Sequence, residues 1–186
     1  MILRNPARAF SKACACALPF FLFAAVATSA AAQTKSVPPV AADALQKLLP
    51  TVDGWTSGPA RADLVELSAD TKYSFASVTL TKGDQRVKLT LADTGSNADS
   101  LAALATMVVS MPDDYSGDVG EMSIKRSSIG GSPGVETWEA KKTTGEVTVV
   151  VGGRFVATVE SSKIDSVATL RSILEKVDLK ALGALK

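Results

Sequence analysis

The chain has 186 residues, with 20 Lys and Arg against 19 Asp and Glu, a formal net charge of +1, two cysteines and no histidine. Without histidine it cannot build a Ser-His or Cys-His catalytic pair, an imidazole-ligated zinc site or a histidine pH switch. The balanced charge argues against a dedicated nucleic-acid binder, which carries a basic excess. The length is typical of one domain.

Residues 1–32 have the pattern of a signal peptide. The cations of this segment, which contains no acid, are Arg4, Arg8 and Lys12. They precede an apolar run over 13–26, which has the length of a signal-peptide core and is short for a membrane span. Ala30 to Ala32 supply the small residues of a cleavage site. We therefore expect cleavage near Ala32 and a mature chain that begins at Gln33.

Both cysteines, Cys14 and Cys16, lie in this leader, so the mature chain would depend on its core and not on disulfides. Subtracting the three leader cations from 20 leaves 17 Lys and Arg against 19 Asp and Glu, a net charge of −2. We expect a bacterial protein, periplasmic or secreted, without a membrane span in its mature chain. Residues 33–39 are predicted as a linker and residues 40–186 as a single domain.

The mature chain opens with a helix and a β-hairpin. Apolar residues recur at helical spacing over 41–49, and Pro50 ends the pattern. Strands are predicted over 72–80 and 85–91, joined by a turn at 82–84.

In the first of these strands the apolar residues move from odd to even positions along its length. Tyr73 and Phe75 fall on one parity, and the later aliphatic residues fall on the other. This change predicts a β-bulge near residues 76–77.

The second half of the chain is predicted to contain a helix, an acidic loop, a run of strands and two final helices. Gly152 and Gly153 have the composition of a two-residue hairpin loop. Asp165 is expected to cap the first of the last two helices, and the second is expected to begin at Asp178. In chain order the predicted elements are a helix over 99–110 capped by Asp99, an acidic loop over 113–120, strands over 121–125, 134–141, 147–151 and 154–160, and helices over 165–177 and 178–185.

Because the strands come in hairpin runs and do not alternate with helices, the sheet should be antiparallel. The sequence therefore predicts an α+β fold, with an antiparallel sheet of about six strands and helices packed on one face.

The segment from Gly130 to Gly134 matches G-x-S-x-G, the nucleophile elbow of the α/β-hydrolases, with Ser132 as the nucleophile. A serine at such an elbow needs a general base, and the family uses histidine, which this chain lacks. A glycine-rich turn between two strands is the interpretation that fits.

Asp93, Thr94 and Gly95 follow an apolar strand and resemble the active-site turn of aspartic proteases. In that family two aspartates share one proton and activate water, so a single copy would need a homodimer. The family continues with a strand, whereas residues 100–109 read as a helix. The other interpretation is a turn in which Asp93 accepts backbone N–H groups near Gly95, as Asx turns do.

An acidic segment raises the possibility of a calcium loop at Asp113, Asp114 and Asp118. Counted from Asp114, the EF-hand spacing places Val119 where glycine is required and Lys125 where the bidentate glutamate belongs. The segment therefore fails as an EF-hand. A solvated acidic loop and an irregular calcium site remain as interpretations, and no other metal or cofactor is expected.

Trp55, Trp138 and Arg154 are the candidate ligand-binding residues. The tryptophans could line an apolar pocket or serve as large core residues. Arg154 follows the Gly152–Gly153 turn and could present a cation at the hairpin mouth, or could be a plain exposed arginine.

Over nearly all of the mature region the chain resembles a group of uncharacterised exported proteobacterial proteins. The resemblance implies export and a single domain, and it implies no particular chemistry. The residues that carry it are Leu48 to Pro50, Gly54 and Trp55, Asp93 at a strand end, Glu136 to Trp138, Gly145 to Val147, Arg154 to Val156, Ile164 and Asp165, and Val177 to Leu179.

The leading hypothesis is a non-catalytic module that binds a protein partner, an envelope component or a small apolar ligand. The alternatives are a carboxylate-dependent hydrolase using Asp93 and a purely structural envelope protein. A binder would have a hollow near Trp55 or Trp138, an enzyme would have two facing carboxylates, and a structural protein would have a flat surface.

Overall fold

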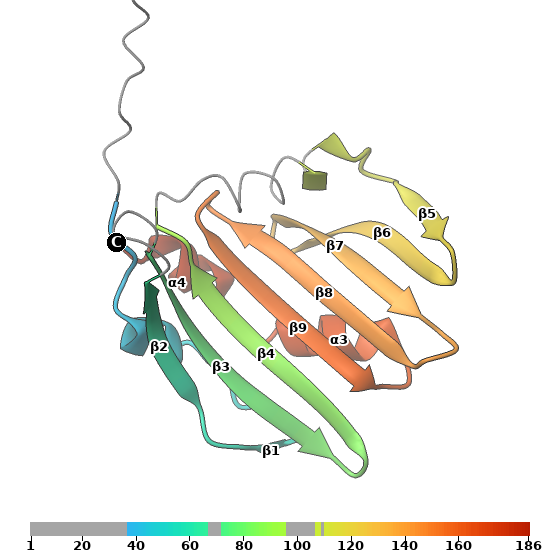
Figure 1. The fold of residues 1–186 in the computed structure, drawn as a ribbon, viewed down its shortest axis with the longest axis horizontal. Coiled ribbons are helices and arrows are strands. Elements are labelled where there is room, and N and C mark those ends of the chain that lie inside the picture. Colours follow the sequence, from blue (N-terminus) through green and yellow to red (C-terminus); the bar gives the residue numbers. More distant parts are fainter. Residues whose placement is uncertain (1–36, 67–71, 96–106, 109) are drawn as a thin grey trace, which may run out of the picture. The chain divides into compact units, whose positions relative to one another are not determined.

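The computed structural model describes residues 37–66, 72–95, 107–108 and 110–186, and within these ranges nine strands form one antiparallel sheet. The strand order is β1-β3-β4-β9-β8-β7-β6-β5, and β2 also pairs with β3 (Figure 1). The strands are β1 (Thr56–Ser57), β2 (Arg61–Glu66), β3 (Lys72–Lys82), β4 (Gln85–Asp93), β5 (Ser116–Val119), β6 (Met122–Ile129), β7 (Ser132–Glu139), β8 (Thr144–Val151) and β9 (Phe155–Lys163). The predicted signal peptide lies outside the described residues.

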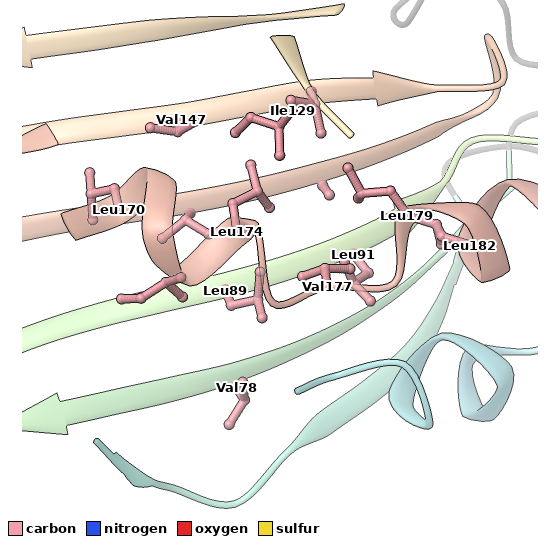
Figure 2. Packing of buried hydrophobic residues seen from close by; sticks show 14 of the residues in the cluster. Val78, Leu89, Leu91, Ile129, Val147, Leu170, Leu174, Val177, Leu179 and Leu182 are labelled. Atoms are coloured by element: carbon pink, nitrogen blue, oxygen red, sulfur yellow. The ribbon is translucent and has the colours of Figure 1, made fainter. Parts of the chain in front are cut away.

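The helices with described bounds are α1 (Ala42–Gln46), α3 (Val167–Leu174) and α4 (Leu179–Ala184), and these three contribute to one core with the sheet. Strand alternation places Val78, Leu89, Val159 and Val147 side by side across β3, β4, β9 and β8. Figure 2 shows Leu170 and Leu174 of α3 packed over this apolar face. The predicted antiparallel sheet with helices on one face is therefore confirmed. No helix in the described ranges is long and apolar enough to cross a membrane.

The predicted count of about six strands is wrong. The predicted α+β class is also corrected, because the protein is mainly β with a few short helices. The three strands that the sequence does not predict are β1, β2 and β5. Their residues are mostly exposed and lack a clean apolar alternation. They are held by backbone pairing with β3 and β6, which a periodicity argument does not detect. In particular, β5 occupies part of the segment that was predicted as an acidic loop.

The predicted bulge at residues 76–77 is also wrong. β3 keeps one continuous register with β4 from Ser74 to Lys82. The change of parity arises because Tyr73 and Phe75 face away from the helices, with their ring centroids 6.4 Å apart. The irregularity in this part of the sheet lies instead between Arg86 and Val87, where β4 pairs with β9.

The predicted starts of the last two helices have different outcomes. The last helix begins at Asp178 as expected, and Asp178 is its N-cap, whose Oδ1 accepts the N–H of Ala181 at 2.8 Å. The N-cap of α3 is Ser166, and the carboxylate of Asp165 accepts a hydrogen bond from Gln85 Nε2 instead. The predicted helix over 99–110 lies outside the described residues apart from 107–108 and 110, which are helical.

The predicted hairpin tip at Gly152 and Gly153 is confirmed. Both glycines have positive φ, +60° and +69°, and Arg154 N–H donates to Val151 O at 3.2 Å across them. Gly130 and Gly131 have φ of +57° and +80° between β6 and β7. The G-x-S-x-G segment is therefore a tight antiparallel turn, not a strand-to-helix elbow.

Replacing Gly153 with Val should lower the free energy of unfolding by about 1–2 kcal/mol, because a β-branched residue is strained at positive φ. A Cβ at this position would meet no atom of the described residues within 4 Å, so the expected cost is backbone strain. Urea denaturation measures the change. Gly153→Asn is the control, since asparagine tolerates this conformation and should cost less. Equal stability of the Val variant and the wild type would contradict the assigned turn.

Candidate functional site

Asp93 and Arg154, which the sequence marks as candidates for separate reasons, form one ion pair. Arg154 Nε donates to Asp93 Oδ1 at 2.9 Å, and a terminal guanidinium nitrogen donates to Oδ2 at 2.7 Å. Asp93 ends β4 directly opposite Phe155 of β9, which brings the preceding Arg154 to the carboxylate. The Asp93 side chain is fully buried, and the Arg154 side chain is 21% exposed.

The carboxylate of Asp93 has two further donors. Val40 N–H donates to Oδ2 at 2.7 Å, and Gly95 N–H donates to Oδ1 at 2.8 Å. Arg154 also donates to the carbonyl of Pro38 at 3.0 Å. The hydrogen bond to Asp93 is the main cause that raises the pKa of Arg154; their Coulombic attraction adds to it, and burial opposes it. The pair therefore ties the segment before α1 to the end of β4 and to the β8–β9 hairpin.

This environment accounts for both residues as structural groups. The predicted bond from Gly95 N–H to Asp93 is present, as an Asx turn requires. An aspartic-protease carboxylate must reach a water shared with a second aspartate. The carboxylate of Asp93 has no exposed surface, and both of its oxygens are occupied. The guanidinium of Arg154 is likewise engaged by Asp93 and Pro38.

The two tryptophans lie in different parts of the structure. Trp55 and Trp138 are both partly buried against the apolar core. A Cβ on Gly145 would lie 2.7 Å from the Trp138 ring and 3.2 Å from Leu170, so glycine makes room for this ring. Trp138 also lines a surface hollow, whose lining does not include Trp55.

The acidic candidates are also separated. Asp113 forms an ion pair with Arg126 at 3.0 Å, and Asp118 lies in β5 opposite Ser123. Asp114 lies in the turn that precedes β5. In the part of the chain that the structure describes, no three or more His, Cys, Asp or Glu residues are grouped to hold a metal ion.

The hollow lined by Trp138 has a volume of about 450 Å³, and we call it the open-face hollow. Most of its lining comes from the sheet face opposite the helices. One continuous cross-strand row accounts for five of its lining residues, namely Thr79, Lys88, Glu160, Glu146 and Thr137, from β3, β4, β9, β8 and β7. The next residues along these strands, among them Val78, Leu89, Val159 and Val147, belong to the core on the helix side.

Charges of both signs line the open-face hollow. Lys88 and Glu160 form an ion pair at 3.0 Å, and Glu139 pairs with Lys142 at 2.9 Å. Glu146 Oε1 accepts the hydroxyl of Thr148 at 2.7 Å. Among the described residues, neither Glu146 nor the guanidinium of Arg86 has an ion-pair partner. One anionic and one cationic group in the hollow are therefore left without a counter-charge.

Glu146 and Glu160 lie directly opposite each other in the β8–β9 pairing. Two like charges at this position destabilise a sheet. The ion pair with Lys88 offsets only the charge of Glu160.

The sequence did not single out Arg86 or Glu146 as site residues. Charged residues are common on the solvent-facing side of a strand, so their presence there does not indicate a site. Only the pairing of β4 with β9 and of β9 with β8 brings them to one hollow.

The sequence matches no protein-family model, and searches of curated proteins and of solved structures found no match.

Proposed function

We propose that the protein is a non-catalytic binding module of the periplasm or cell exterior, and that it binds a small polar molecule carrying both a cationic and an anionic group. The observation that carries this proposal is the presence of Arg86 and Glu146, both without an ion-pair partner among the described residues, in a hollow of about 450 Å³. This volume lies in the range of small-molecule sites. Export rests on the leader pattern of residues 1–32.

The spacing of the strands supports a ligand with two separated charges. One strand, β9, lies between β4 and β8, and Arg86 is two residues along β4 from Lys88, which lies in the same cross-strand row as Glu146. The backbones of Arg86 and Glu146 are therefore roughly 12 Å apart. A ligand carboxylate on Arg86 could form two parallel hydrogen bonds, and a ligand ammonium on Glu146 would form a charge-assisted one. Amino acids and short peptides carry this pair of groups. The charged and hydroxyl-bearing lining favours such a ligand over the apolar one that the sequence suggested.

Isothermal titration calorimetry of the purified protein with a dipeptide tests the proposal, together with N-acetylated and C-amidated forms of the same dipeptide. The free dipeptide should bind, and each blocked form should bind about tenfold more weakly, because each loses one charge-assisted hydrogen bond. Arg86→Gln and Glu146→Gln should each weaken binding of the free dipeptide by a similar factor.

Lys47→Gln is the matched control, because Lys47 is an exposed cation next to α1 and does not line the open-face hollow. It should leave the affinity unchanged. Equal affinity for the free and blocked dipeptides, or no effect of either hollow variant, would contradict the proposed ligand class. Absence of binding by every form would contradict the proposed function.

A carboxylate-dependent hydrolase remains the second candidate, and the position of Glu146 opposite Glu160 is the observation that favours it. Glycosidases use two carboxylates that flank the bond they cleave. Incubation with oligosaccharides distinguishes the two functions. Turnover that Glu146→Gln abolishes would support the hydrolase, and dipeptide binding without turnover would support the binding module.

A further inference from the structure

We propose a second binding site, for a phosphate-type oxyanion, at the edge of β6. A cavity of about 530 Å³ lies there, and its lining includes Lys125, Arg126, Ser127, Arg171 and Asp113. It shares no lining residue with the open-face hollow. The proposal therefore does not rest on the function proposed for that hollow.

The charged lining of this cavity has a positive excess, with three cations against the single carboxylate of Asp113. Asp113 pairs with Arg126 at 3.0 Å, and Arg171 pairs with the buried Glu136. A guanidinium carries five N–H donors, so an ion pair with one carboxylate leaves donors on Arg171 for a ligand. In the described part of the chain, the ammonium of Lys125 has no hydrogen-bond or ion-pair partner.

Ser127 gives the second, independent indication of a ligand. Ser127 lines the cavity and is 8% exposed, yet within the described residues its hydroxyl has no hydrogen-bond partner. A buried polar group without a partner is uncommon and destabilising in a folded protein. An oxyanion in the cavity would accept a hydrogen bond from this hydroxyl. The cationic lining and the unpartnered donor therefore both favour an anionic ligand that accepts hydrogen bonds.

The fold brings these groups together from two elements. Lys125 and Ser127 are two residues apart on β6, so their side chains lie on the same face. Arg171 of α3 reaches Glu136 of β7, which is the cross-strand neighbour of Lys125. A tetrahedral oxyanion suits this set, because it accepts hydrogen bonds in several directions from hydroxyl, ammonium and guanidinium donors.

Calorimetry with inorganic phosphate at low ionic strength tests the site. Lys125→Gln should weaken phosphate binding about tenfold, the effect of losing one charge-assisted hydrogen bond. Ser127→Ala should also weaken binding, while its melting temperature stays equal to or above that of the wild type because an unpartnered hydroxyl is removed. This separation of affinity from stability is a readout that misfolding would not produce. Lys180→Gln, an exposed cation of α4, is the control and should bind phosphate like the wild type.

Phosphate binding that neither Lys125→Gln nor Ser127→Ala weakens would overturn the site, as would the absence of phosphate binding by the wild type.

A second experiment distinguishes the two sources of such an anion, a lipid headgroup and a free phosphate. Vesicles of phosphatidic acid and phosphatidylcholine present the same group on a lipid. Vesicle binding that free phosphate displaces, and that Lys125→Gln weakens, would identify a lipid headgroup as a ligand. Phosphate binding without vesicle binding would identify a free phosphate or phosphomonoester.

Discussion

Replacing Arg154 with Met should lower the free energy of unfolding by about 3–5 kcal/mol, the range found when one partner of a buried ion pair is removed. The carboxylate of Asp93 would stay fully buried, and its remaining donors among the described residues would be the N–H groups of Val40 and Gly95. The methionine side chain fills a similar volume, so the loss would report the charge and its hydrogen bonds. Urea denaturation measures it.

Two further variants separate charge from geometry. Arg154→Lys keeps the positive charge but cannot form the two parallel hydrogen bonds, so it should lose less stability than Arg154→Met. Asp93→Asn combined with Arg154→Met removes both charges and should recover part of the loss, because no ionised group remains buried without a partner. A loss below about 1 kcal/mol in Arg154→Met would mean that the pair does not hold the fold together.

The direction in which the pKa of Arg154 is shifted determines how its contribution to stability changes with pH. The pKa of Arg154 is raised above its ordinary value, mainly by its hydrogen bond with Asp93. A raised pKa of a base gives stability that is fully present below the unfolded pKa and is lost only as the pH rises through the folded pKa. The guanidinium therefore stays charged from neutral to moderately alkaline pH, and its contribution to stability should not fall across that range.

Replacing Gly134 with Ala should cost about 3 kcal/mol, the upper end of the usual range for overpacking. A Cβ on Gly134 would lie 2.4 Å from the carbonyl oxygen of Thr148 and 2.6 Å from Val149 Cγ1. The valine side chain could move, but the carbonyl belongs to the backbone of β8, which pairs on both sides with β7 and β9. Relief would therefore require a shift of the central sheet.

Gly131→Ala is the matched control from the same glycine-rich segment. Its φ is +80°, and in the described part of the chain no atom lies within 4 Å of a Cβ placed there, so backbone strain of about 1–2 kcal/mol is expected. Thermal and urea denaturation of both variants measure the difference. If Gly134→Ala were no more destabilised than Gly131→Ala, the close approach of β7 and β8 at this position would be wrong.

The sequence by itself determined the local features of the fold. The turns at 82–84 and at Gly152 and Gly153, and the start of α4 at Asp178, were predicted correctly. These features depend on φ preferences and on hydrogen bonds within a few residues, which the local sequence encodes. The apolar alternation of β4 likewise predicted which face of that strand is buried.

The tertiary structure decided what depends on distant partners. Asp93 and Arg154 are 61 residues apart, and no local signal indicates that they meet. Asp165 accepts a hydrogen bond from Gln85, 80 residues away, and does not cap α3 as its local position suggested. Partners that are distant in the sequence also decide two other features, namely the pairing of the edge strands β1, β2 and β5 and the grouping of charges in the open-face hollow. Strand register, set by packing of the whole core, selects which side chains become neighbours, and alternation along one strand leaves that choice open.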